Sequence, residues 1–248
     1  MVFKSMDEFR LWLGLCEKAY LSEGGQGRCY KIGNKVYKIF LQYLEKCYED
    51  IIIPYYKEDI LRFSGVTNNT YVFPNDVIMV GNTVVGYIMD YIDAKSLYKT
   101  DPFSVDLDYF EESINASLND IEIISNNGVL SFDVMYNMMF GKEGISVIDT
   151  LDYSMTDIDP DKLFVMNYDR FCHEIKLFLV YGYFDNVVEN NKILNEMYID
   201  KESSIVLFLK EFRKYLSEIE GYEIKKLSDV KKSKVVRRRK YHAYIREI

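Results

Sequence analysis

The chain has 248 residues, of which 48% are hydrophobic and 28% charged, proportions typical of a globular protein with a sizeable core. Its formal net charge of −8 argues against nonspecific binding to nucleic acid or to an anionic membrane. With only two histidines and no supporting motif, a zinc site or a serine–histidine–aspartate triad is not expected. The cysteines have neither metal-like nor disulfide-like spacing, so we interpret them as reduced and buried: Cys16, Cys29, Cys47 and Cys172.

The N-terminal stretch lacks a continuous apolar core of signal-peptide length, and no apolar run is long enough to cross a membrane. We therefore expect no membrane span. The predicted location is the cytoplasm, or an exported state reached without a Sec-type signal.

Residues 5–19 are predicted to form a short amphipathic helix that leads into a glycine cluster. The cluster contains Gly24, Gly25 and Gly27, and two runs rich in β-forming residues follow it. Gly33-Asn34 separates these runs and suits a two-residue hairpin turn. Lys38 lies inside the second run, on the strand next to the glycines.

Glycines let a backbone pass close to phosphates, because no Cβ intervenes, and a lysine on the adjoining strand supplies a point charge. The Gly-Lys-Ser/Thr of a P-loop is absent, and a hairpin stands where a dinucleotide fingerprint needs a helix. Strand, glycine loop, strand and lysine together resemble the nucleotide lid of protein kinases. The alternative is an ordinary glycine-bearing hairpin with a solvated lysine.

Helical spacing predicts a helix over residues 41–52 and a second helical piece over residues 55–63, which carries Glu58. Residues 76–93 contain two apolar runs separated by Gly81-Asn82, which predicts a second hairpin. Residues 1–92 are therefore expected to form a small domain built on an antiparallel sheet.

Residues 93–224 are predicted to be mainly helical, with a long helix over 107–125 and two or three helices from Tyr168 to about residue 218. The final stretch, 225–248, is rich in lysine and arginine. We interpret it as a solvated or frayed basic tail. The alternatives are a docking arm for an acidic partner and a cover packed on the acidic body.

A second group of polar residues lies between the predicted helices. Asp133 and Asn137 flank a tight loop, and a strand–turn–strand over residues 138–148 ends at Asp149. Phosphoryl transfer needs such groups: one carboxylate receives the hydroxyl proton, while an amide oxygen and a second carboxylate hold Mg²⁺ against the triphosphate.

Over residues 20–155 the order of these motifs resembles the protein kinase superfamily. The resemblance implies a two-lobed α+β fold, with a small antiparallel-sheet N-lobe and a reduced helical C-lobe. It implies that Asp133 is the catalytic aspartate and that Asn137 and Asp149 are the Mg²⁺ ligands. It also implies that Lys38 binds the ATP phosphates and pairs with Glu58. The other expected nucleotide-binding residues are Ser22, Gly24, Gly25, Gly27, Cys29, Met89 as gatekeeper, and Asp90 and Ile92 of the hinge.

The chain also departs from the family pattern. Asn137 comes four residues after Asp133, whereas the family has five, and Ser131-Phe132 replaces the usual His-Arg. No Ala-Pro-Glu follows Asp149. These differences resemble minimal, bacterial-type members that lack a regulated activation segment.

We therefore expect an ATP- and Mg²⁺-dependent phosphotransferase, with a protein hydroxyl as acceptor. The first alternative is a pseudokinase that acts as a nucleotide- or protein-binding module, because the short loop between Asp133 and Asn137 could misplace either side chain. The second alternative is a small-molecule kinase of the aminoglycoside or choline type. The interval between Asp93 and Asp133 leaves little room for the extra helices of that type.

Overall fold

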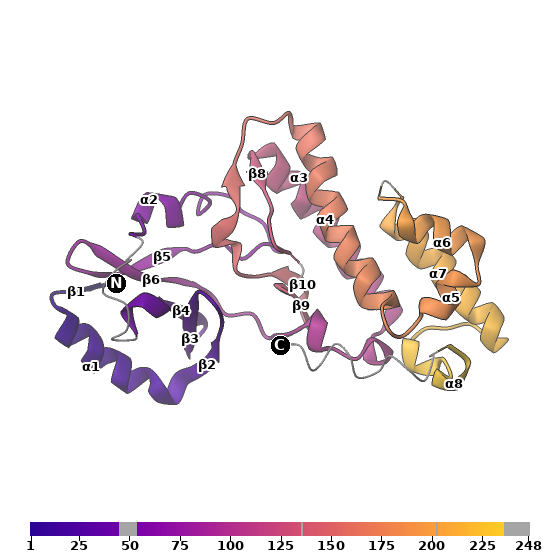
Figure 1. The fold of residues 1–248 in the computed structure, drawn as a ribbon, viewed down its shortest axis with the longest axis horizontal. Helices are drawn as coiled ribbons and strands as arrows, with labels where there is room; N and C mark the ends of the chain where they lie inside the picture. Colours follow the sequence, from indigo (N-terminus) through magenta and orange to yellow (C-terminus); the bar gives the residue numbers. More distant parts are fainter. Residues whose placement is uncertain (45–53, 135, 202, 236–248) are drawn as a thin grey trace. The chain divides into compact units, whose positions relative to one another are not determined.

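The computed structural model describes residues 1–44, 54–134, 136–201 and 203–235, in a mixed α+β arrangement (Figure 1). The described chain divides into two compact units. The first unit comprises Met1–Thr67, Tyr71–Asp93 and Ile148–Leu151. The second unit comprises Asn68–Thr70, Ala94–Val147 and the described chain from Asp152 onward. Most of the predicted helix over residues 41–52, together with Cys47, lies outside the described residues.

Six strands form the sheet of the first unit, in the order β1-β5-β6-β4-β3-β2 (Figure 1). They are β1 (Val2–Phe3), β2 (Tyr20–Glu23), β3 (Gly27–Ile32), β4 (Lys35–Phe40), β5 (Asp76–Val80) and β6 (Thr83–Asp90). Both predicted hairpins are present, and their turns begin at Gly33 (φ 64°) and Gly81 (φ 57°), in the region that favours glycine. The sheet is not purely antiparallel as predicted, because β1 pairs with β5 in parallel.

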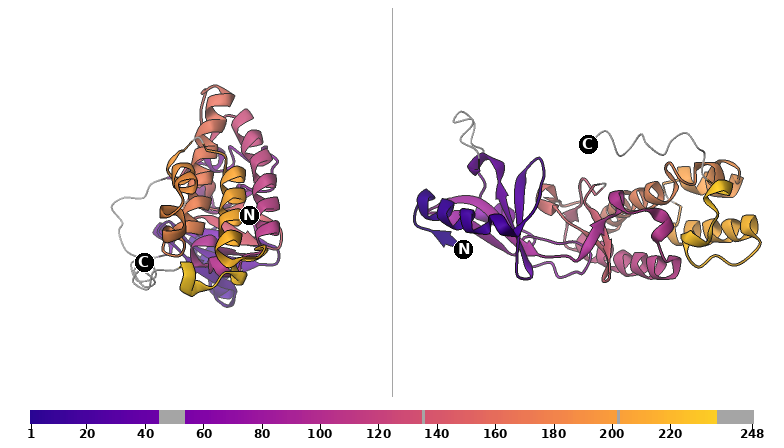
Figure 2. Two further views of the ribbon diagram at one scale, coloured as in Figure 1. Left: turned by 90° about the vertical axis from the view of Figure 1, so that its right-hand side faces the viewer. Right: turned by 90° about the horizontal axis from the view of Figure 1, so that it is seen from below.

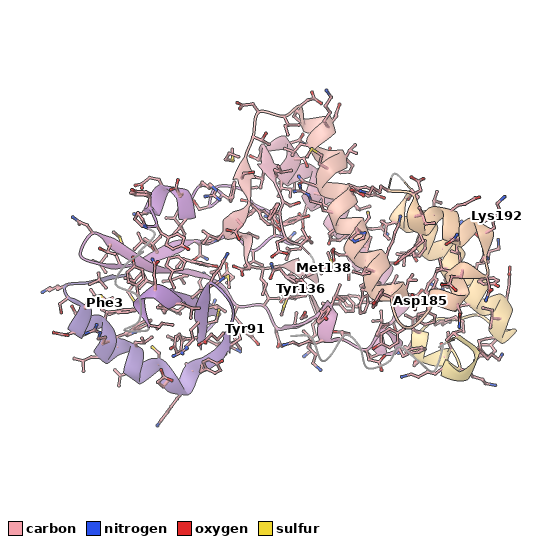
Figure 3. All side chains as sticks on the ribbon, in the orientation of Figure 1. Phe3, Tyr91, Tyr136, Met138, Asp185 and Lys192 are labelled. Atoms are coloured by element: carbon pink, nitrogen blue, oxygen red, sulfur yellow. The ribbon has the colours of Figure 1, made fainter. Side chains whose placement is uncertain are left out.

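One face of this sheet packs against the helix α1 (Met6–Cys16), which Figure 2 shows in indigo beside the strands. The helix begins after Ser5, whose side chain accepts a hydrogen bond from the Glu8 backbone N–H (3.2 Å), as an N-cap residue does. Phe9 of this helix is fully buried, and its ring centroid lies 5.5 Å from that of Phe3, which Figure 3 labels on β1. The helix therefore shields this face of the sheet from water.

The opposite face of the sheet forms its own apolar cluster, which includes Val36, Phe40 and Met89. The ring of Phe40 stacks on that of Tyr55, with 3.9 Å between the centroids. The helical piece predicted over residues 55–63 is shorter than expected, since α2 covers only Lys57–Ile60. Within residues 55–63 the structure has one turn of α-helix, where the sequence spacing suggested more than two.

The second unit is mainly helical. Its helices are α3 (Leu107–Asn126), α4 (Pro160–Val180), α5 (Asp185–Glu189), α6 (Lys192–Ile199), α7 (Ile205–Glu220) and α8 (Lys232–Val235). Helices α3 and α4 pack side by side (Figure 1). Helix α4 begins eight residues before the predicted Tyr168, because Asp159 caps it and Pro160 suits its first turn.

Short strands of the second unit carry its loops. Strands β9 (Met138–Gly141) and β10 (Gly144–Val147) form the predicted strand–turn–strand, and β7 (Ala94–Ser96) pairs with β9. Strand β8 (Val129–Leu130) pairs with β11 (Ser154–Met155). The loop that contains Asp133 therefore runs between the ends of two strands, β8 and β9.

The basic segment that was predicted as a frayed tail is packed on the second unit over its described part. The Leu107 N–H donates to the Lys225 carbonyl (3.0 Å), and the Leu227 N–H donates to the Val105 carbonyl (3.1 Å). Lys226 and Lys232 form ion pairs with Asp106 (3.5 Å) and Asp101 (3.3 Å). The interpretation as a cover on the acidic body fits residues 225–235, and residues 236–248 lie outside the described part.

Of the helices that the structure describes, none has both the length and the apolar character needed to cross a membrane.

The surroundings of the glycines predict which of them the sheet requires. A Cβ on Gly27 would lie 2.6 Å from the Ile39 carbonyl oxygen, whereas a Cβ on Gly24 would meet nothing within 4 Å. Gly27→Ala should therefore lower the free energy of unfolding by about 1–3 kcal/mol through overpacking. Gly24→Ala should change it by less than about 0.5 kcal/mol. Urea unfolding of both variants measures the difference, and equal losses would contradict this account.

Candidate active site

Three residues form a row across neighbouring strands of the first unit. Cys29 on β3 lies opposite Lys38 on β4, and Lys38 lies opposite Tyr87 on β6. Directly opposed residues of antiparallel strands project to the same side of a sheet, so these side chains share one face. Lys38 and Tyr87 are nearly inaccessible to water, with 5% and 1% of their surfaces exposed.

The buried ammonium of Lys38 has two partners. Its Nζ forms an ion pair with Asp149 Oδ1 and donates a hydrogen bond to Gln26 Oε1 (3.3 Å). The Tyr87 hydroxyl donates to the same oxygen of Asp149 (3.2 Å). A buried charge needs a partner to offset its lost hydration, and Asp149 is the counter-charge of Lys38 within the sheet.

The segment Ile148–Leu151 brings Asp149 into the first unit. The side chain of Thr150, which is 1% exposed, donates to the Val72 carbonyl (2.9 Å). The Arg62 guanidinium donates to the Leu151 carbonyl (2.6 Å). These bonds fix the backbone on the C-terminal side of Asp149, whose φ of 58° is left-handed.

The glycine loop joins β2 to β3. The Gly24 N–H donates to the Gly27 carbonyl (3.0 Å), and Arg28 pairs with Glu23 (2.5 Å), so the base of the loop is closed. Nothing lies within 4 Å of a Cβ built on Gly24 or on Gly25. The tip of the loop therefore has free space around its backbone, as a phosphate-binding loop requires.

The burial of the cysteines differs from the prediction at one residue, which lies on β3. Cys16 and Cys172 are buried as predicted, but Cys29 is half-buried, and all three are free thiols. Desolvation raises the pKa of the Cys29 thiol, so it stays protonated at neutral pH. The exposed Ser22 lies opposite Cys29 on β2.

The predicted ion pair between Lys38 and Glu58 is not formed in this structure. Glu58 lies exposed on the four-residue helix α2, and Lys38 binds the Asp149 carboxylate instead. Two further glutamates lie in sequence between β4 and α2, Glu45 and Glu49, and both are outside the described residues.

The predicted hinge follows β6. Met89 is 6% exposed and belongs to the apolar cluster of the Lys38 face, and Ile92 packs against the same cluster. Asp90 binds Lys35 (2.7 Å), and the Lys31 ammonium lies 3.5 Å from the ring centroid of Tyr91, which Figure 3 labels. The roles of Met89, Asp90 and Ile92 in adenine binding stay predictions.

In the second unit, α4 holds the loop before Asp133. Asn167, which is fully buried, accepts hydrogen bonds from the Ser131 N–H (2.8 Å) and hydroxyl (2.9 Å). One turn further, the Arg170 guanidinium lies 5.7 Å from the ring centroid of Phe132. Residues spaced three or four apart lie on one side of a helix, so α4 contacts successive loop residues turn by turn.

Another turn along α4 lies Glu174, which is 9% exposed. Burial raises the pKa of its carboxyl to about 7, and the nearby negative charge of Asp133 adds to the effect. Glu174 is therefore partly protonated at neutral pH and responds to the charge of Asp133.

Asp133 and Asn137 end this loop. Asn137 Nδ2 donates to the Asp133 carbonyl (2.8 Å), which leaves its Oδ1 as the oxygen for a ligand. Tyr136 and Met138, labelled in Figure 3, lie on either side of Asn137. Asp133 has a left-handed φ of 45°, and among the described residues only Asp133 and Asp149 combine a side chain with positive φ. Such backbone strain concentrates at functional sites.

Within the described chain, no group of three or more histidine, cysteine, aspartate or glutamate side chains is placed to hold a metal ion. The predicted Mg²⁺ ligands are one amide and one carboxylate, to which a nucleotide would add its phosphates. The Mg²⁺ role of Asn137 and Asp149 therefore stays a prediction.

Sequence reasoning missed four residues around these groups: Gln26, Tyr87, Asn167 and Glu174. For Tyr87 a signal existed, because the two hairpin turns at Gly33 and Gly81 constrain the strand register. The contacts of Asn167 and Glu174 depend on how α4 packs, and no local pattern reveals them.

No protein family matches the sequence, and neither does any curated protein. Among solved structures, the chain is similar to a kinase from Legionella pneumophila that was solved bound to IP6. The two share 16% identity with a TM-score of 0.43, and the match covers 82% of this chain and 81% of that chain.

The raised pKa of Glu174 predicts how stability varies with pH. Between its ordinary pKa of 4.5 and the folded value of about 7, the native state keeps a proton that the unfolded state releases. Ionisation of Glu174 therefore lowers stability as pH rises through this window, and the loss is complete above it. Glu174→Gln should be more stable than the natural protein well above pH 7, by up to roughly 3 kcal/mol, and similar near pH 4.5. Urea unfolding across this range checks it, and parallel pH profiles would contradict it.

Proposed function

We propose that this chain is an ATP- and Mg²⁺-dependent phosphotransferase that transfers the γ-phosphoryl group to a hydroxyl. The observation that carries the proposal is the buried contact between Lys38 and Asp149. The two residues belong to motifs 111 positions apart. The kinase resemblance implies phosphate binding for Lys38 and Mg²⁺ binding for Asp149. An ordinary hairpin with a solvated lysine would leave Lys38 exposed.

The proposed roles follow from the charge and surroundings of each group. Lys38 donates to the phosphates of ATP, and the open tip of the glycine loop at Gly24 and Gly25 lets the backbone approach them. Asp149 and Asn137 Oδ1 would hold Mg²⁺, which would offset the negative charge of the phosphates. The exposed Asp133 accepts the proton of the attacking hydroxyl.

A protein hydroxyl is the proposed acceptor, because the chain between Asp93 and Asp133 holds a single long helix, α3. The extra helices expected of aminoglycoside or choline kinases are not among the described residues of that interval.

The hydrogen bonding of Asn137 bears on the pseudokinase alternative. Its bond to the Asp133 carbonyl keeps the shortened loop closed and leaves Oδ1 available for a metal ion.

Transfer of radiolabel from γ-labelled ATP to the chain itself or to a protein mixture tests this function. Asp149→Asn and Asp133→Asn remove a carboxylate and keep a residue that tolerates left-handed backbone. Each variant, and also Lys38→Met, should lower the transfer rate by at least about a hundredfold. Thermal unfolding verifies that the variants remain folded. Transfer at the natural rate by a folded Asp149→Asn would refute the proposal, and nucleotide binding without transfer in the natural protein would identify a pseudokinase.

The proposed metal site has its own test. Titration calorimetry measures how much Mg²⁺ strengthens ATP binding. Asp149→Asn and Asn137→Ala should each reduce this gain by about tenfold or more, because each removes an oxygen ligand of the metal. Asn115→Ala, at an exposed position of α3, is the matched control and should leave the gain unchanged. A full gain in either site variant would remove that residue from the metal site.

A further inference from the structure

The hydroxyl of Tyr87 was assigned no role by the motifs, yet it lies within the charged cluster of the first unit. Tyr87 is 1% exposed and lies directly opposite Lys38 in the pairing of β4 with β6. The Lys38 ammonium is 5.7 Å from the centroid of the Tyr87 ring. The hydroxyl donates a hydrogen bond to Asp149 Oδ1 (3.2 Å), the oxygen that also binds Lys38.

Two donors on one carboxylate oxygen leave the other oxygen available. The hydrogen bonds that Asp149 accepts from described residues all go to Oδ1, and its side chain is 30% exposed. A carboxylate held at one oxygen by an ammonium and a phenol is fixed in rotation about its side-chain bonds. Its Oδ2 is then presented in one direction, as a Mg²⁺ ligand needs to be, because Mg²⁺ demands near-ideal geometry.

We propose that Tyr87 is the positioning residue that orients Lys38 and Asp149, and this inference rests on the phosphotransferase function proposed above. Tyr87 touches neither nucleotide nor acceptor in this role. It acts through Asp149, whose carboxylate it holds against the lysine.

The group that orients Asp149 comes from the strand next to Lys38, and the β4–β6 hydrogen bonds hold Tyr87 and Lys38 in register. Glu58, the predicted helix partner, is exposed. The position of Lys38 beside Tyr87 is therefore set by the sheet.

The first test needs no nucleotide and uses the complete chain. Tyr87→Phe removes only the hydroxyl and keeps the buried ring. Tyr30→Phe is the matched control, since Tyr30 is a fully buried tyrosine of the same sheet whose hydroxyl lies 3.5 Å from Glu17. The readout is the rate at which an amine-directed acetylating reagent modifies Lys38, measured by mass spectrometry.

Loss of the hydrogen bond should loosen the ion pair and raise the labelling rate of Lys38 by about tenfold in Tyr87→Phe. Tyr30→Phe and Glu58→Gln should label at the natural rate. An unchanged rate in Tyr87→Phe, or an equal rise in Glu58→Gln, would overturn the positioning role. The labelling rate of Lys38 is measured on protein without nucleotide. Its result therefore does not depend on whether the chain transfers phosphate.

The second test uses Mg²⁺ and ATP by titration calorimetry. Tyr87→Phe should weaken the Mg²⁺-dependent part of ATP binding by about tenfold and the Mg²⁺-independent part by less, because Asp149 Oδ2 loses its orientation whereas Lys38 keeps its place on β4. A residue that merely stabilised the fold would weaken both parts equally, and that result would overturn the inference. Absence of nucleotide binding in the natural protein would instead refute the proposed function.

Discussion

The structure of the first unit depends on a lysine ammonium held inside a sheet. Lys38 is excluded from water on a face that is otherwise apolar, and the hydration that it loses is offset by the carboxylate of Asp149. That carboxylate comes from a segment remote in sequence, so the chain must return to the first unit at Ile148–Leu151. The hydrogen bonds from Thr150 to the Val72 carbonyl and from Arg62 to the Leu151 carbonyl hold the returning segment in the first unit. One buried charge thus constrains the strand register, the path of the chain and the conformation of its partner.

In the second unit, the loop around Asp133 has little regular structure of its own. Helix α4 supplies the order that the loop lacks. Asn167 accepts hydrogen bonds from the backbone and side chain of Ser131, and the Arg170 guanidinium lies near the ring of Phe132. Glu174 then adds a weakly acidic group near Asp133. The helix thus contacts this loop at intervals of one turn, and side chains supported by a regular element are held more precisely than those of an unsupported loop.

The parts of the fold that the sequence predicted correctly are those set by local chemistry. Gly33-Asn34 and Gly81-Asn82 identified both hairpins, because their left-handed residues leave few other conformations. The parallel pairing of β1, the early start of α4 and the packing of residues 225–235 depend on contacts between distant segments, which periodicity does not report. The site followed the same division. Lys38 and Asp149 were found from their motifs, whereas the predicted pair of Lys38 with Glu58 is not formed in this structure, because the partner of Lys38 is decided by tertiary packing.

The left-handed backbone at Asp133 and Asp149 has an evolutionary consequence. Few residues besides glycine accept this conformation, and asparagine is one of them. Aspartate and asparagine codons differ at a single base, so one tolerated change at either position replaces a carboxylate with an amide of nearly the same shape. If these aspartates carry the proposed chemistry, a lineage can lose catalysis in one mutational step and keep its fold. Descendants of this chain that act only as binding scaffolds would then be recognised by asparagine at these two positions.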